Sequence, residues 1–189
     1  MARPTGFEIT WNQADLIPFK QGKLTTSLFQ AVKRAGSDGL RTMRTFGSRY
    51  VRNRKKLKLK RVREGLTPRF PSSGSGMRDL EWSLKVDGSP IPVSDYPSRQ
   101  LRKGVKTTIN VNSPKLIKGA FIATMKNGHT GVFVRAGKER LPINKLFSST
   151  LVDVFHDTKM IPNAFREVQA KMEETYQRLL PIALAKTLK

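Results

Sequence analysis

The sequence predicts an α+β fold: an N-terminal basic helical segment, an antiparallel β meander and a C-terminal amphipathic helix. Three observations support this prediction. Apolar residues recur at helical spacing from Leu24, alternate with polar residues from Leu80 to Val111, and return to helical spacing from Asn163. The length of 189 residues suits a single domain, which we expect to be subdivided into 1–66 (helical and basic), 67–77 (loop or linker), 78–147 (antiparallel sheet) and 148–189 (C-terminal helices).

The N-terminal segment contains one short strand pattern and one long helical pattern. "FEITW", residues 7–11, is compatible with a strand. From Leu24 the apolar spacing is helical and continues to Tyr50, with Thr25 or Thr26 as the candidate N-cap. Glycine has a low helix propensity, so the glycines at positions 36 and 39 predict a break or kink in the middle of this helix.

A basic run follows within the same segment, with eleven lysines and arginines and no acid between residues 41 and 63. Like charges at helical spacing destabilise a helix, so the run needs an anion, which could be phosphate or an acidic protein; an unengaged surface is the third interpretation. Aromatic residues are sparse here, which favours sequence-independent contact with a nucleic-acid backbone over base stacking. "KLKLK", residues 56–60, fits a helix or a strand. The candidate DNA or anion contacts are Arg41, Arg44, Arg49, Arg52, Arg54, Lys55, Lys56, Lys58, Lys60, Arg61 and Arg63.

The central segment has the pattern of an antiparallel sheet. Leu80, Trp82, Leu84 and Val86 alternate with polar residues, as in a half-buried strand, and a second alternation runs over residues 105–111. Asn127-Gly128 separates two apolar runs, which is a strong signal for a β-hairpin.

The C-terminal segment predicts an amphipathic helix that starts at Asn163 as its N-cap. Pro181 is expected to kink or end this helix, and a shorter helix is expected at about 149–156. The apolar stripe of the long helix consists of Phe165, Val168, Met172, Tyr176 and Leu179.

Composition narrows the possible functions. Thirty-six basic residues against fourteen acidic ones give a formal charge of +22, and self-repulsion of that size favours an anionic partner. The absence of cysteine excludes disulfides, thiolate metal sites and cysteine nucleophiles. The sequence has no signal-peptide pattern and no apolar stretch of membrane-spanning length, so we expect a soluble protein that folds in a reducing cytoplasm.

Residues that could carry catalysis are not grouped in the sequence. His129 and His156 lie far apart, each without a second ligand at metal-binding spacing, and the acidic residues are scattered. "GSG" at 74–76 lacks the lysine and the helix of a phosphate-binding loop. We therefore expect no enzyme activity, no catalytic residue, no metal site and no cofactor.

Residues 118–147, "KGAFIATMKNGHTGVFVRAGKERLPINKLF", are a hairpin with a basic exit on physical grounds, and they also resemble a known family. The minor tail protein Z family of tailed bacteriophages has a similar "GAFIA-x-M-x-x-G-H-x-G-V-F-x-R" hairpin followed by "LPI-x-x-L". "LEWSLKVDGSPIPVSDY" and "RQLRKGVKTTINV" resemble upstream family segments, so the resemblance extends over the whole chain. One departure is "FSST" at 147–150, where the family has an aromatic residue, Gly, Pro and Ser. The candidate signature residues are Gly119, Ala120, Phe121, Asn127, Gly128, His129, Gly131, Val132, Phe133, Arg135, Leu141, Pro142 and Ile143.

The resemblance implies a structural virion protein: a minor tail or tail-completion component at the head-proximal end of the tail. Such a protein helps to complete the tail, to join head and tail, and to seat the DNA end. Its expected partners are the tail-terminator or tail-tube ring, further copies of itself in a closed ring, and the genome end; no membrane and no small-molecule substrate are expected. Assembly would take place in the host cytoplasm. The alternative is a free-standing, sequence-independent nucleic-acid-binding protein.

Overall fold

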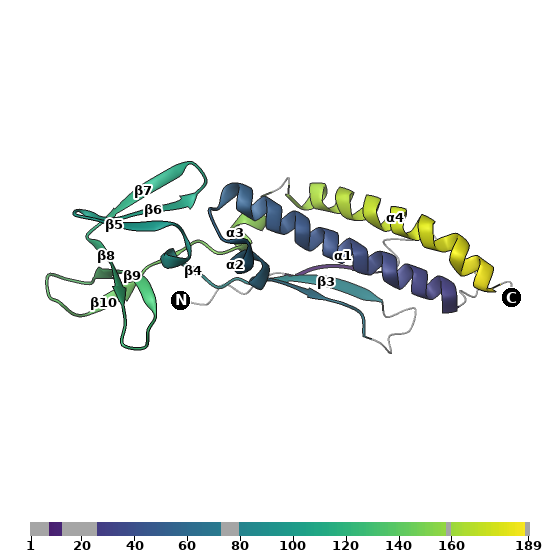
Figure 1. The fold of residues 1–189 in the computed structure, drawn as a ribbon, viewed down its shortest axis with the longest axis horizontal. Helices are drawn as coiled ribbons and strands as arrows, with labels where there is room; N and C mark the ends of the chain where they lie inside the picture. Colours follow the sequence, from purple (N-terminus) through teal and green to yellow (C-terminus); the bar gives the residue numbers. More distant parts are fainter. Residues whose placement is uncertain (1–7, 13–25, 73–79, 158–159, 188–189) are drawn as a thin grey trace. The chain divides into compact units, whose positions relative to one another are not determined.

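The computed structural model describes residues 8–12, 26–72, 80–157 and 160–187 (Figure 1). It confirms the α+β class, with two long helices, short helical turns and antiparallel strands. The described residues fall into two compact units. Unit 1 contains Ser48–Gly65 and Asp87–Val154; unit 2 contains the described parts of Phe7–Gly47, Leu66–Val86 and Phe155–Lys189. The subdivision of a single domain into four segments stays a prediction. No helix in the described part of the chain is long and apolar enough to cross a membrane.

Unit 2 is built around the helices α1 (Thr26–Arg54) and α4 (Met160–Thr187), with α1 residues up to Gly47 in this unit. The two helices lie side by side in Figure 1, and Thr175 of α4 donates a hydrogen bond to the Asp38 carboxylate of α1 at 3.5 Å. Their facing sides are apolar: Met160, Ala164, Val168 and Met172 of α4 are all buried. The predicted stripe is confirmed at Val168 and Met172, while Phe165, Tyr176 and Leu179 are half-buried beside it.

The predicted break in the first helix is wrong, because α1 runs without interruption from Thr26 to Arg54. Its two glycines, Gly36 and Gly39, allow side chains of neighbouring elements to approach the helix closely. A Cβ atom added at Gly36 would collide with the indole ring of Trp82, and one added at Gly39 would lie 2.7 Å from the Sδ atom of Met172. The low propensity of glycine is thus offset by close approach of neighbouring elements. Of the two candidate N-caps, Thr26 is the first helical residue and Thr25 lies outside the described residues.

A three-stranded antiparallel sheet completes unit 2, in the order β1 (Glu8–Asn12), β3 (Glu81–Val86), β2 (Leu66–Arg69). The strands predicted from "FEITW" and from the alternation at 80–86 are confirmed. The predicted loop at 67–77 is wrong in its first residues, because Leu66–Arg69 form β2. Pro68 fits there because β2 is an edge strand, where proline is tolerated. Residues 73–77 of that loop lie outside the described part of the chain.

The helix α4 differs from its prediction at both ends. It begins at Met160, so Asn163 is a helical residue and not the N-cap. Pro162 is compatible with this start because the first turn of a helix needs no proline N–H group. Pro181 does not end the helix, which continues to Thr187. Pro181 and Gln177 are exposed, so water can solvate the carbonyl that Pro181 leaves without an N–H partner.

Unit 1 contains the remaining strands, all antiparallel. The four-residue core Val93, Val105, Ala120 and Val132 lies between its sheets, with Ile117, Ile122 and Leu146 packed against it. The predicted strand at 105–111 is confirmed as β6. The sheets are β5 (Ser98–Leu101), β6 (Gly104–Asn110) and β7 (Ser113–Lys118); β8 (Ala120–Thr124), β9 (Thr130–Arg135) and β10 (Ile143–Lys145); and the pair β4 (Ile91–Pro92) and β11 (Phe147–Ser148).

The predicted hairpin is confirmed between β8 and β9, and Gly128 has a positive φ of 79°. Its loop has three residues. The Gly128 N–H group donates to the Met125 carbonyl at 2.9 Å, and the Met125 N–H group donates to the His129 carbonyl at 3.0 Å. A turn followed by a glycine in the left-handed region is a common three-residue hairpin loop.

The short helix predicted at 149–156 is α3 (Val152–Phe155). It is preceded by a reciprocal cap: the Asp153 N–H group donates to Thr150 Oγ1 at 3.3 Å, and the Thr150 N–H group donates to the Asp153 carboxylate at 2.7 Å. This is the arrangement of a capping box, with aspartate in the place usually taken by glutamate.

Candidate functional site

The basic run is neither one helix nor one strand. The helix α1 ends at Arg54, residues 55–58 form a short link, and α2 (Leu59–Glu64) follows. The link is held against β6 of unit 1: Lys55 pairs with Asn110, and the Lys56 N–H group donates to the Ile109 carbonyl at 2.9 Å. The "KLKLK" stretch is therefore divided between an extended link and the first turn of α2.

Buried apolar and exposed basic side chains alternate along this link. Leu57 is buried (5% exposed), and Val62 of α2 is completely buried. Lys56, Lys58 and Lys60 are exposed. The apolar residues thus anchor the backbone of the run in the core of unit 1, and the lysines remain in solvent.

An open groove of about 970 Å³ lies over this region, and all its lining residues belong to unit 1. It brings together six of the eleven predicted contacts, while Arg49, Arg54 and Arg63 do not line it and Arg41 and Arg44 belong to unit 2. We call it the basic groove. Its lining residues are Arg52, Lys55, Lys56, Leu57, Lys58, Lys60, Arg61, Glu64, Ser94, Asp95, Tyr96, Pro97 and Val111.

Two of the six cations are fixed by neighbours inside unit 1. The Arg61 guanidinium donates to the Asp95 carboxylate at 2.9 Å and lies 3.9 Å from the Glu64 carboxylate. The Lys55 ammonium donates to Ser149 Oγ at 2.6 Å. Burial lowers the pKa of Lys55, and the carboxylate of Asp153 partly opposes this by raising it. Both acidic residues of the groove lining, Asp95 and Glu64, are therefore paired with Arg61.

The other four cations, Arg52, Lys56, Lys58 and Lys60, are exposed, and none forms an ion pair or side-chain hydrogen bond with the residues that the structure describes. The groove therefore has an excess of positive charge that its two acids do not neutralise. Clustered like charges of this kind produce a local positive potential that attracts anions.

The groove offers no exposed aromatic ring among its described residues. Tyr96 is its one aromatic lining residue, and it is 3% exposed. Burial raises the pKa of the Tyr96 hydroxyl. The Tyr96 side chain belongs to the core, so it offers no ring surface to a ligand in the groove.

Two arginines of the run outside the groove are engaged elsewhere. In unit 2, Arg41 pairs with Asp38 at 2.7 Å and lies over the ring of Phe70. In unit 1, Arg54 donates to the Tyr50 hydroxyl at 2.7 Å and stacks on the same ring, 4.6 Å from its centroid. Arg44, Arg49 and Arg63 also interact with other parts of the chain.

The signature residues of the hairpin lie mainly in the sheet β8-β9-β10 and its turns. Ala120 and Val132 are core residues, and Gly131 is covered by the ring of Phe133. The rings of Phe121 and Phe133 are 6.2 Å apart, and the Arg135 guanidinium lies 5.9 Å from the centre of the Phe121 ring. Gly119, with a φ of 72°, joins β7 to β8, while Asn127, Gly128 and His129 form or follow the exposed loop.

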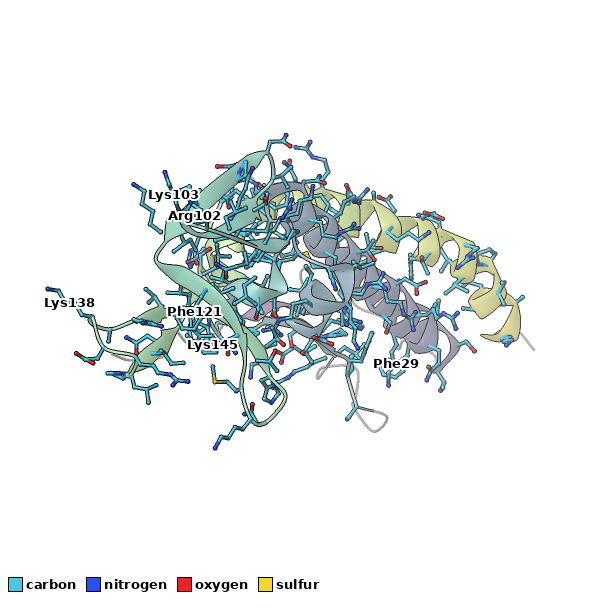
Figure 2. The ribbon with its side chains drawn as sticks, turned by 60° about the vertical axis from the view of Figure 1, so that its left-hand side comes forward. Phe29, Arg102, Lys103, Phe121, Lys138 and Lys145 are labelled. Atoms are coloured by element: carbon cyan, nitrogen blue, oxygen red, sulfur yellow. The ribbon has the colours of Figure 1, made fainter. Side chains whose placement is uncertain are left out.

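The "LPINKLF" exit has an inward and an outward side. Ile143 pairs with Arg135 in the sheet, and Leu146 packs on the core of unit 1. Leu141, beside Pro142, is 67% exposed, and Phe147 is 54% exposed. The Lys145 ammonium lies 5.7 Å from the centre of the Phe147 ring. In Figure 2, Lys138 projects from the preceding loop and Lys145 lies on the neighbouring strand.

No group of three or more potential metal ligands occurs among the described residues. His129 is exposed at the hairpin loop, and His156 follows α3. The described residues thus define a small α+β protein whose distinguishing surfaces are the basic groove and the exposed apolar exit of the hairpin.

The comparison with protein families identifies the kind of protein. The family described as prophage minor tail protein Z (GPZ) matches residues 85–189, which is more than half of the chain, so this chain belongs to that family. It is a structural component of a phage tail and associates with other tail proteins. No curated protein and no solved structure matches the chain. The match begins at residue 85, so the expected resemblance of residues before it, including the basic run, has no support from the family.

Proposed function

We propose that this chain is a tail-completion protein at the head-proximal end of the tail, where it helps to complete the tail, join it to the head and seat the DNA end. The observation that carries this proposal is the hairpin and its exit, which lie inside the family match. Leu141 and Phe147, near the two ends of that exit, are large apolar side chains exposed to solvent. Exposed large apolar side chains are candidates for contact with a protein partner.

The partner at this surface is a ring protein of the tail, either the terminator or the tube, or a second copy of this chain in a closed homo-oligomeric ring. Closed symmetry satisfies every interface of an assembly. A charge of +22 opposes folding of the isolated chain, and partners that neutralise it would stabilise the folded state. The expected location is the virion tail, with assembly in the host cytoplasm.

A contact with the genome end is the second part of the proposal. The basic groove supports it, because the groove combines six cations with two acids that already pair with Arg61. Of the eleven candidate cations of the sequence, six line the groove, and the proposed site for the genome end is formed by these six. No enzyme activity and no cofactor enter the proposal.

One observation favours the alternative of a free-standing nucleic-acid-binding protein: the basic run lies outside the family match. Such a protein would share the charge and the groove. It would have no use for an exposed apolar exit in the matched region, so we favour the tail component.

The test is a virus that lacks this gene, complemented with wild type or with the variant Leu141→Asp/Phe147→Asp. Loss of the protein should leave tails that join heads poorly and particles of low infectivity. Because both side chains are exposed, the variant should fold normally, with an unchanged melting temperature, and fail to complement. Lys126→Asp, at an exposed position of the hairpin loop, changes the charge by the same amount; it is the control and should complement. The tail proposal fails if purified virions lack the wild-type chain while host nucleoids or ribosomes contain it.

A further inference from the structure

We propose that the basic groove is a binding site for the phosphate backbone of duplex DNA, in which Arg52, Lys56, Lys58 and Lys60 make the contacts. Arg61 and Lys55 act as positioning residues that fix the walls. This rests on the proposed function in one respect, that the chain meets the genome end. The four proposed DNA contacts all lie before residue 85, outside the family match.

The first support is charge. Six cations line the groove against two acids, and both acids lie within 4 Å of Arg61. Arg52, Lys56, Lys58 and Lys60 therefore have no acidic neighbour of their own in the groove lining. Their mutual repulsion is relieved by a ligand with several regularly spaced negative charges, and the DNA backbone has one at every nucleotide.

The second support is the way in which the cations are held. Leu57 and Val62 are buried, and the link is held on β6 by the Lys56 N–H group, which donates to the Ile109 carbonyl, and by the pairing of Lys55 with Asn110. These contacts fix the positions from which three lysines leave the surface, and the flexible ends of the side chains remain free. The backbone that carries the groove lysines is thus fixed by the packing of unit 1.

The third support concerns the class of ligand. Protein partners are held mainly by buried aromatic or apolar anchors, and single strands by base stacking on exposed rings. In the described lining, Leu57 and Tyr96 belong to the core, and the other apolar residues are the exposed Pro97 and the half-buried Val111, so the groove presents no exposed aromatic ring and no large apolar anchor. Lysine is a point charge that contacts phosphate without reading bases. Sequence-independent contact with duplex DNA fits this surface best.

The number of contacts predicts the salt dependence. With four phosphate contacts, the slope of log K against log salt concentration should be about −3.6, which is about a 150-fold loss of affinity between 50 and 200 mM salt. Fluorescence anisotropy with the full chain and a labelled duplex of arbitrary sequence measures this slope. Two duplexes of different sequence should give the same slope and affinity.

The variant Lys56→Gln/Lys58→Gln/Lys60→Gln removes three contacts, so its slope should fall to about −0.9. The matched control Arg102→Gln/Lys103→Gln/Lys138→Gln removes the same charge from the same unit, at exposed positions that project into solvent (Figure 2) and do not line the groove. Its slope should stay near that of wild type. Lys56→Arg/Lys58→Arg/Lys60→Arg keeps the charge and should also keep the slope.

The proposal is overturned if the control flattens the slope as much as the groove variant does, since the effect would then be one of net charge. It is also overturned if poly-glutamate binds the wild-type chain more tightly than duplex DNA at equal salt, since an acidic protein would then be the partner. Far-ultraviolet circular dichroism checks folding, and Lys58→Gln alone, with a slope change of about 0.9, replaces the triple variant if that does not fold. Incorporation of the groove variant into tails separates the two proposals: a variant that enters tails without binding DNA leaves the tail function intact.

Discussion

The two glycines of α1 give a sharp test of the packing in unit 2. In an exposed helix, Gly→Ala stabilises by about 1 kcal/mol because alanine has the higher helix propensity. At Gly36, however, the new methyl group would collide with the ring of Trp82, which is completely buried. Inserting a methyl group into a well-packed core costs about 1–3 kcal/mol, and an indole with its N–H group on Ser37 has little room to shift.

We therefore expect Gly36→Ala to destabilise the protein by up to about 2 kcal/mol after the gain in propensity is subtracted, which lowers the melting temperature by up to roughly 8 °C for a chain of this size. Gly39→Ala is the control. Its methyl group would meet the thioether of Met172, an unbranched and adaptable side chain, so its cost should be close to the gain in propensity. Thermal unfolding followed by circular dichroism and by tryptophan fluorescence measures both. A higher melting temperature for Gly36→Ala would show that Trp82 does not pack on α1 as described.

Three further predictions concern single features of the fold. Gly128→Val should destabilise by about 1–2 kcal/mol, because a β-branched residue disfavours a φ of 79°; Gly137→Val, at a glycine with open space and no positive φ, should change the melting temperature little. Thr150→Ala should cost about 1 kcal/mol through loss of the cap of α3, and Thr150→Ser should restore most of it in a urea titration; equal losses for both would exclude the cap as the cause. Burial raises the pKa of Tyr96 above its usual value of 10.0, so the unfolded state loses this proton first and stability should fall as the pH rises above 10. Tyr96→Phe should reduce that fall between pH 9 and 11, and an unchanged fall would assign it to other groups.

The strands and the hairpin were predictable because their signals are local. Alternation at residues 80–86 and Asn127-Gly128 between two apolar runs each specify a structure within a few residues. The hairpin loop has three residues and not two, because Gly128 alone adopts the left-handed region while Met125 and His129 close the loop.

Features that depend on distant residues were not predictable from such patterns. The sequence does not show whether a glycine in a helix bends the helix or allows a neighbouring side chain to approach closely. At Gly36 the neighbour is the ring of Trp82, which is distant in sequence. The link at 55–58 takes its conformation from β6, and the start of α4 at Met160 precedes the capping signal at Asn163. Tertiary contacts override local propensity in each of these cases.

The candidate site shows the same division. The sequence predicts a basic run that needs an anion, because charge density is a local property. It does not indicate which cations act together, since that depends on Asp95, Ser149 and Tyr50, residues that pair with three members of the run. Folding therefore reduces eleven equivalent candidates to four exposed cations in one groove.

The basic groove also combines residues from inside and from outside the family match. Its cations lie between residues 52 and 61, before the family match, whereas Asp95 and the wall at 94–97 lie inside the match. The matched part thus supplies both the hairpin with its exposed exit and the carboxylate that fixes Arg61. The unmatched part supplies the charge that makes the groove attractive to an anion. Because the two contributions come from different residues, contact with other tail proteins and contact with DNA are separable by mutation, which is the physical basis on which the two proposals can fail independently.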